Sequence, residues 1–363
     1  MAVPGHRKLD DSERSVRIRR AVSAKSRVNE RELRAAVRAP AQALVGAIRR
    51  VRPELLIAAP FVVIFVAGLA RGLPLNAPDG SSVLFVERHY FRPLIAAVVL
   101  QALVLMLPSQ AGRSRLDGKT IAWLVGLVAV TLVVHFNFKA WMPLVHGRLF
   151  DLELGRSDMV FGGLVPWLIA VRRAIAGACA AHLGLDVDPL YHFAFVAMFF
   201  ASFSGHAVFD TPLGLRKVVL GACAVLLFGG VLYWILPAEG PFLTRVVEGH
   251  AAPGAQRAMS AMFDSVLATR RFPAGYFVAP LAAMPSLHTA HAALFCLYAR
   301  RRVRWLRIFF YPALGWILIE AVAAGWHYVL DLAAGALLAA FCVYLVDWLL
   351  PEPASAAVRG TTG

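Results

Sequence analysis

The sequence predicts an all-α integral membrane protein with about eight transmembrane helices, the last six of which form one bundle. Of the 363 residues, 59% are hydrophobic and 16% are charged, whereas an ordinary soluble domain carries about 25% charged residues. Apolar runs recur along the chain at close to the length of about 17 to 25 residues that spans a bilayer. Basic residues gather in the short stretches between these runs, which is typical of cytoplasmic loops.

Residues 1–52 form a basic arm that we expect to be cytoplasmic and partly disordered. They hold 14 Lys and Arg against 5 acidic residues, and so supply +9 of the net charge of +15. Residues 24–52 read either as a basic helix on the membrane surface or as a solvated arm. Because the arm leads directly into an apolar run, we expect it to contact the anionic cytoplasmic leaflet, and we expect no nucleic-acid partner. No signal peptide is evident near Met1.

Two spans are expected within residues 53–118 and six within residues 119–350, followed by a cytoplasmic tail at 351–363. The expected spans are Leu55–Ala70, Leu94–Leu107, Thr120–Phe138, Leu190–Phe209, Val218–Leu236, Ala283–Ala299, Ile308–Ala324 and Tyr328–Leu350.

The basic stretches predict how these spans are oriented. The arm, the loop at 113–119, the pair Arg216-Lys217 and the loop at 300–307 fall on one side if all eight spans are real. The rule that positive loops stay inside makes that side cytoplasmic, together with both termini. Residues 160–183 are apolar as well, but Arg172-Arg173 at their middle favours an interfacial or re-entrant helix.

Two polar clusters lie in the most apolar quarter of the chain, at Pro285-Ser286-Leu287-His288 and at His327-Tyr328-Val329-Leu330-Asp331. Residues four apart in a helix share one face, so we expect Asp331 to reach the ring of His327. An ionisable group costs at least about 2.5 kcal/mol at the centre of a bilayer. The two clusters therefore predict a functional site, which the orientation above places outside the cytoplasm.

These residue types suit phosphoryl transfer, which needs a nucleophile, a proton donor and a cradle for negative charge. His327 could attack phosphorus while Asp331 fixes its tautomer and stabilises the cation that forms. His288 could protonate the departing oxygen. The backbone of Ser286 and Leu287 could supply part of the cradle.

The sequence PSLH, followed by GWHYVLDLAAG, resembles the second and third motifs of the type 2 phosphatidic acid phosphatase superfamily. PSLH itself, the stretch Phe150–Gly163 and the stretch Tyr233–Pro241 look like the branch that contains fungal inositol phosphorylceramide synthase. The resemblance implies a bundle of six catalytic helices, a phosphohistidine intermediate, and neither metal nor cofactor. It assigns the nucleophile to His327, the orienting aspartate to Asp331 and the leaving-group histidine to His288.

The chain departs from the superfamily in its arginines. The third motif usually carries Ser-Arg where this chain has Glu320 and Ala321, and the Lys and Arg-Pro of the first motif are absent. We expect Arg245 to supply the missing charge. Arg270 and Arg271 are the next candidates for binding the substrate, and Glu320, Asp151 and Asp158 are candidates for supporting the site from behind.

The function expected is transfer of an inositol-phosphate-like headgroup from a phospholipid donor to the hydroxyl of an acceptor lipid. One alternative is hydrolysis of a lipid phosphate or polyprenyl diphosphate. A second is a transporter in which His327 and Asp331 relay protons, although no repeated halves are evident. The pair could also be a core contact, His291 is expected to pack, and Ser204-Gly205-His206 is expected to serve helix packing. The oligomeric state is left open.

Overall fold

The computed structural model describes residues 52–82, 99, 117–187, 189–242 and 254–352. Regular secondary structure within these ranges is entirely helical. Residues 1–51 of the predicted arm, Arg245 and residues 353–363 of the predicted tail lie outside the described residues, and the predicted span Leu94–Leu107 is described only at Val99. The helices are α2 (Pro53–Ala70), α4 (Gly118–Val145), α5 (Asp151–Val160), α6 (Leu164–Leu183), α7 (Leu190–Phe209), α8 (Pro212–Ile235), α9 (Gly254–Thr269), η1 (Tyr276–Val278), α10 (Leu287–Arg301), η2 (Arg304–Leu306), α11 (Arg307–Ala323) and α12 (Val329–Leu349).

Seven helical segments of the described part are long and apolar enough to cross a membrane, which identifies a multi-pass membrane protein. They are α2, α4, α6, α7, α8, the segment Arg304–Ala323 and α12. The predicted sixth span differs from the observed helix, because α10 has 15 residues and begins at Leu287 rather than Ala283. Pro285 and the N-cap residue Ser286 fix this later start, since the hydroxyl oxygen of Ser286 accepts from the N–H of Thr289.

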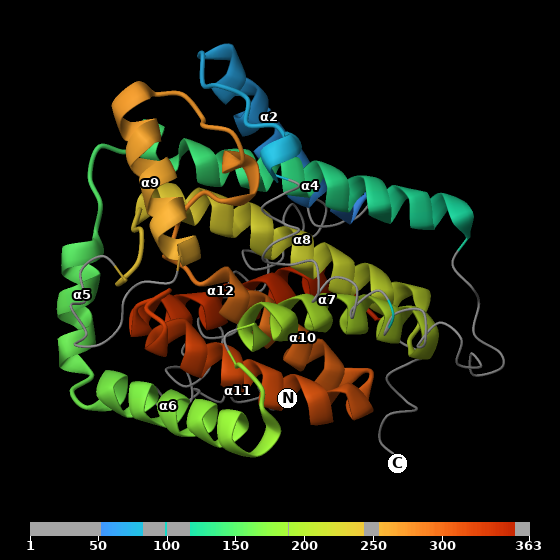
Figure 1. Ribbon diagram of the computed structural model, residues 1–363. Helices are drawn as coiled ribbons and strands as arrows, with labels where there is room; N and C mark the ends of the chain where they lie inside the picture. Colours follow the sequence, from blue (N-terminus) through green and yellow to red (C-terminus); the bar gives the residue numbers. More distant parts are fainter. Residues whose placement is uncertain (1–51, 83–98, 100–116, 188, 243–253, 353–363) are drawn as a thin grey trace, which may run out of the picture. The chain divides into compact units, whose positions relative to one another are not determined.

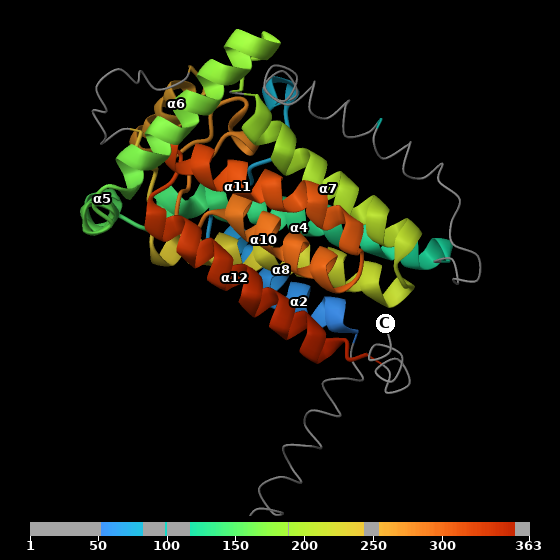
Figure 2. The same ribbon diagram turned by 90° about the horizontal axis from the view of Figure 1, so that it is seen from below.

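Helix α10 lies at the centre of the bundle and packs against α7, α8, α11 and α12 (Figures 1 and 2). Helix α4 packs along α8, and α2 packs against both of them. The predicted bundle of the last six spans thus corresponds to α4, α7, α8, α10, α11 and α12. Figure 1 shows these helices running side by side, with α5 and α9 at one end.

Helix α6 packs against α11 but crosses the long helices obliquely, as Figure 2 shows. It is one continuous helix of 20 residues, and its apolar surface is almost entirely uncovered by the rest of the chain. Arg172, near its middle, donates from Nε and Nη2 to the two carboxylate oxygens of Glu320 at 2.6 and 3.1 Å. The guanidinium that argued against a simple span is therefore bound to α11, where it ties α6 to the flank of the bundle.

The basic loops lie together at the end of the bundle opposite the two histidine motifs. Lys217 at the start of α8 pairs with Asp347 near the end of α12 at 2.9 Å. Arg302, just after α10, pairs with Asp210 at the end of α7 at 3.2 Å. Both motifs begin their helices, α10 and α12, at the other end. The common side predicted for Arg216-Lys217 and for the loop at 300–307 agrees with this arrangement.

Helices α10 and α12 approach each other closely at Gly335. A Cβ atom added there would meet the carbonyl oxygen of Ser286 and would lie 3.3 Å from the nitrogen of Ala290. Both of these atoms are backbone, so neither can move aside as a side chain could. Small residues at such crossings allow the backbones of membrane helices to pack directly. Gly335 is therefore required by the contact that holds the two motifs side by side.

We expect Gly335→Ala to destabilise the folded protein by about 1 to 3 kcal/mol, because the added methyl group overpacks the crossing. Gly315→Ala on α11 is the matched control, since a Cβ there meets nothing within 4 Å and Ala is the better helix former. Thermal unfolding of both purified variants in detergent measures the difference. An unchanged melting temperature for Gly335→Ala would show that the crossing tolerates a side chain.

Candidate functional site

His327 lies in the turn between α11 and α12, where its backbone N–H donates to the carbonyl oxygen of Ala321 at 2.9 Å. Its Nδ1 is 3.3 Å from Oδ2 of Asp331, as the spacing predicts. The expected reason for the contact is wrong, however, because α12 begins only at Val329 and His327 precedes the helix. The contact comes from the geometry of a helix N-terminus rather than from one face of a helix.

Asp331 is completely buried and holds this turn in place. Its Oδ2 also accepts the backbone N–H of Tyr328 at 2.9 Å, so the carboxylate caps the first turn of α12. Its backbone oxygen accepts the N–H of Ser286 at 3.0 Å. The residue predicted to orient His327 therefore also connects the two motifs.

The backbone N–H and the hydroxyl of Ser286 both form hydrogen bonds within the protein. Its N–H is bound to Asp331 and its hydroxyl caps α10, so it holds the helix start rather than offering its amide to a ligand. Leu287, the first residue of α10, remains as the backbone donor of the predicted pair at this helix N-terminus.

The rings of His288 and His327 lie 6.4 Å apart between centroids, which brings the two predicted catalytic histidines to one place. His288 is half-buried, and three rings of α7 surround it. Their centroids lie 4.1 Å (Phe195), 4.9 Å (Tyr191) and 6.4 Å (His192) from that of His288. His291 instead points both ring nitrogens at backbone oxygens, those of Leu287 and Ala222, in agreement with the expected packing role.

Two of the three carboxylates of α5, those of Asp151 and Asp158, bind the segments around the site. Oδ2 of Asp151 accepts the N–H of Glu239 at 3.0 Å, and Oδ1 accepts the N–H of Gly240 at 2.8 Å and the hydroxyl of Tyr328 at 3.0 Å. Asp158 accepts the N–H of Val329, the first residue of α12, at 2.9 Å. Two stretches singled out in the sequence, at 150–163 and 233–241, thus converge on the turn that carries His327.

Glu239 carries a buried carboxyl group that lies near other carboxylates. It is 7% exposed, and its Oε2 has no hydrogen-bond partner within the described residues. Burial, together with the charges of Asp151 and Asp264, raises the pKa of its carboxyl group to about 8. Burial also raises the pKa of Asp151, although three hydrogen bonds oppose that effect. The loop that contacts the His327 turn therefore carries a carboxyl group that is largely neutral at pH 7.

Of the remaining predicted site residues, Glu320 lies next to a residue that contacts the His327 turn, whereas Arg270 and Arg271 have contacts elsewhere. Glu320 pairs with Arg172, and the carbonyl of the next residue, Ala321, accepts from His327. Arg270 donates to the backbone oxygen of Leu144 at 3.2 Å, at the end of α4. Arg271, which follows it, is exposed. These contacts do not bring Arg270 or Arg271 to the histidines, and Arg245 lies outside the described residues.

Ser204-Gly205-His206 lies far from the site along its helix, near the opposite end of the bundle. His206 binds Asp210 through Nδ1 at 2.7 Å, and Gly205 lies against the side chain of Leu306. This is the expected packing role. In the described part of the chain, no three His, Cys, Asp or Glu side chains gather in a way that could hold a metal ion.

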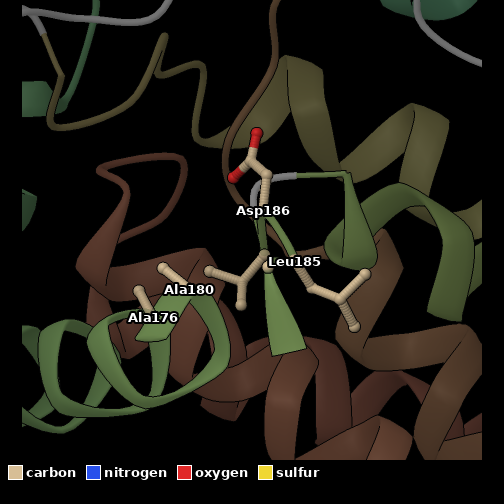
Figure 3. Close-up of a pocket in the computed structure, with 6 residues that line it drawn as sticks. Ala176, Ala180, Leu185 and Asp186 are labelled. Carbon is tan, nitrogen blue, oxygen red and sulfur yellow. The ribbon is translucent and has the colours of Figure 1, made fainter. Parts of the chain in front are cut away.

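A cavity of about 380 Å³ lies at the end of α6, and neither His288 nor His327 is among the residues that line it. Figure 3 shows Ala176 and Ala180 projecting from α6 toward Leu185, with the carboxylate of Asp186 pointing away from them. Its lining is otherwise small and apolar, which does not suit phosphate chemistry. The complete lining is Ala176, Ala180, Gly184, Leu185, Asp186 and Val187.

Sequence reasoning missed three residues near the histidines. His192 and Lys139 belong to helices α7 and α4, outside both motifs, and no spacing links them to His288. Tyr328 was part of the motif, but its role as the partner of Asp151 depends on a contact 177 residues away. A polar residue inside an apolar run was the available signal for Lys139 and His192.

We expect the stability of the protein to fall between about pH 4.5 and pH 8, partly through Glu239. In this window the unfolded chain releases a proton that the folded carboxyl retains, so unfolding is favoured by up to about 1.4 kcal/mol per pH unit. Glu239→Gln should flatten this decline, whereas Glu153→Gln, a side chain 41% exposed on α5, should not. Melting temperatures across this pH range test the difference; identical slopes for wild type and Glu239→Gln would contradict the assignment.

Comparison with known proteins supports the resemblance of the two motifs. Residues 167–345 match the family model described as the PAP2 superfamily, that is, the type 2 phosphatidic acid phosphatases. No curated protein and no solved structure matches the chain. The matched segment includes α10, α11 and most of α12, and therefore both histidines and Asp331. Just under half of the chain, residues 167–345, is thus similar to the PAP2 superfamily.

Proposed function

We propose that this protein is a membrane lipid phosphotransferase that moves a phosphorylated headgroup from a phospholipid to the hydroxyl group of another lipid. The observation that carries the proposal is the convergence of His327, Asp331 and His288 at one end of the bundle, with 6.4 Å between the two imidazole centroids. A phosphorus atom located between the rings would have a nucleophile on one side and a proton donor on the other. Similarity to the superfamily supports the same chemistry.

In the first half-reaction, Nε2 of His327 attacks the phosphorus atom of the donor lipid. Nδ1 faces Asp331 at 3.3 Å, so the carboxylate accepts a hydrogen bond from Nδ1–H and stabilises the positive charge that develops on the ring, while the proton stays on Nδ1. The bond between phosphorus and the ester oxygen of the diacylglycerol breaks as the bond to Nε2 forms. His288 gives its proton to that oxygen, and the headgroup stays on His327 as a phosphohistidine.

In the second half-reaction, the hydroxyl of the acceptor lipid attacks the same phosphorus atom. His288, now neutral, accepts the hydroxyl proton, and the bond from phosphorus to Nε2 breaks. The proton given to the leaving diacylglycerol is thus recovered from the acceptor, and both histidines return to their starting states. Water could take the place of the acceptor, and the protein would then be a phosphatase.

Restricted access of water supports transfer over hydrolysis. His327 is 6% exposed, and Phe195 and Tyr191 pack against the ring of His288. Helix α6, bound to α11 through Arg172 and Glu320, lies beside this end of the bundle with its apolar surface outward. A lipid acceptor can approach along such a surface, whereas water must enter from the aqueous face.

The headgroup and the side of the membrane are also part of the proposal. The resemblance of PSLH and of residues 150–163 to the inositol phosphorylceramide synthase branch favours an inositol-phosphate-like headgroup. The basic loops at the opposite end of the bundle favour a site that faces away from the cytoplasm. Arg245 remains the sequence-based candidate for a further phosphate ligand.

We expect His327→Ala to abolish turnover, because the variant lacks the imidazole proposed to form the covalent intermediate. His288→Ala should reduce the rate by about 10² to 10⁴, the usual contribution of a general acid. Asp331→Asn should remain folded and weakly active, since an amide oxygen can still cap α12. Activity of the purified variants on a labelled phospholipid measures all three.

His182→Ala is the matched control for these substitutions, since this histidine is exposed on α6 and should be dispensable. Recovery of labelled phosphohistidine after rapid quenching should require His327 and should survive in His288→Ala. Normal turnover by a folded His327→Ala protein would remove the nucleophile assignment.

Transfer and hydrolysis can be separated with one substrate. Purified protein should receive a labelled phosphoinositide, with and without ceramide or diacylglycerol. The label should move into a new lipid only when the acceptor is present, and its rate of loss from the donor should rise with acceptor concentration. A water-soluble headgroup phosphate as the main product, unaffected by acceptor, would establish the hydrolase.

A further inference from the structure

Lys139 lies in α4, outside the residues matched by the superfamily and outside both motifs. It is half-buried, and its Nζ lies 5.8 Å from the centroid of the Tyr233 ring. His135, one turn earlier in α4, lies near the same ring, with 6.2 Å between the two ring centroids. Tyr233 lies in the last turn of α8, and Leu236 and Ala238, which follow that helix, pack with Met284 and Tyr328 next to the two histidines. The ammonium group therefore lies at the end of the bundle that holds the histidines.

Lys139 differs from the other shielded cations of the described part in having no carboxylate within ion-pair distance. Its immediate neighbour is an aromatic ring, which attracts a cation by about 0.5 to 2 kcal/mol. The four other buried or half-buried cations are paired: Arg172 with Glu320, Arg216 with Glu54, Lys217 with Asp347 and Arg302 with Asp210.

An ammonium group taken out of water without a counter-ion destabilises the protein, whereas a bound anion removes the penalty. Each of the other four buried or half-buried cations has a carboxylate as its counter-ion, and Lys139 has none within the described residues. The reaction proposed above brings a phosphate group, with negative charge on its non-bridging oxygens, to His288 and His327. The arginine of the third motif, which the resemblance assigns to such oxygens, is replaced here by Ala321.

We propose that the Lys139 ammonium binds a non-bridging oxygen of the substrate phosphate group, and so supplies from α4 the positive charge that the third motif lacks. Arg172 is less suited to this role because both oxygens of Glu320 hold its guanidinium. The inference rests on the proposed function only in placing a phosphate group at His327. It holds equally for transfer and for hydrolysis.

Binding of phosphate analogues tests this role without requiring turnover. The full-length protein and the variants Lys139→Met, Lys139→Arg and Lys119→Met should be titrated with orthovanadate and with dioctanoyl phosphatidic acid. Lys119 is the matched control, because it lies in the same helix, is exposed and sits at the opposite end of the bundle. Methionine keeps the length of the side chain and removes only the charge.

Lys139→Met should weaken the binding of both probes by about tenfold or more, equivalent to roughly 1.4 kcal/mol. Lys139→Arg should retain part of the affinity, and Lys119→Met all of it. Unchanged affinity for orthovanadate in folded Lys139→Met would overturn the proposal and leave Lys139 as a packing partner of Tyr233. Weaker binding of the lipid alone would also overturn it, since the contact would then be to another part of the lipid.

A measurement on the wild-type protein covers the case in which Lys139→Met fails to fold. Acylation of Lys139 by an amine-selective reagent, followed by peptide mass spectrometry, should slow when orthovanadate is bound, while acylation of Lys119 should not. Equal rates at Lys139 with and without orthovanadate would reject the contact. Vanadate binding that depends on Lys139, in a protein that turns over no lipid, would uphold this inference and refute the proposed function.

Discussion

The buried carboxylate of Asp331 is the contact on which the candidate site depends. It caps α12 through the N–H of Tyr328, faces Nδ1 of His327, and belongs to a residue whose carbonyl binds Ser286 at the start of α10. One residue therefore fixes a helix start, a histidine tautomer and the spacing of two motifs. A helix N-terminus favours a carboxylate at this position, so the stability of the fold and the orientation of the predicted nucleophile have the same origin.

The loops around the site repeat this use of carboxylates as acceptors for backbone N–H groups. Asp151 joins the start of α5 to Glu239, Gly240 and the hydroxyl of Tyr328, and Asp158 binds the first N–H of α12. Gly240 also lies close to the next loop, since a Cβ there would be 2.8 Å from the carbonyl oxygen of Trp326. The residues before His327 are thus held from several sides, which limits the motion of a group that must attack in line.

The charged side chains inside the bundle differ in whether they have a counter-ion. The pairs Arg172–Glu320 and Lys217–Asp347 join helices far apart in sequence and leave no shielded carboxylate or cation of either pair without a partner. Lys139 is half-buried without such a partner, and its ammonium group lies over the ring of Tyr233. Because pairing is the rule in apolar surroundings, the exception marks the place where an anion from outside the protein would be bound.

The sequence by itself determined the class of fold, the two histidine motifs and most helix positions, because length, apolar content and short polar clusters are local properties. The contact between His327 and Asp331 was also predictable, although its origin in a helix cap was not. Only the tertiary structure decided that α10 starts at Leu287, that Glu320 holds Arg172, and that Asp151 binds residues 88 and 177 positions away. Contacts of this kind depend on which helices become neighbours, and the periodicity of a single helix carries no information about the side chain that will face it.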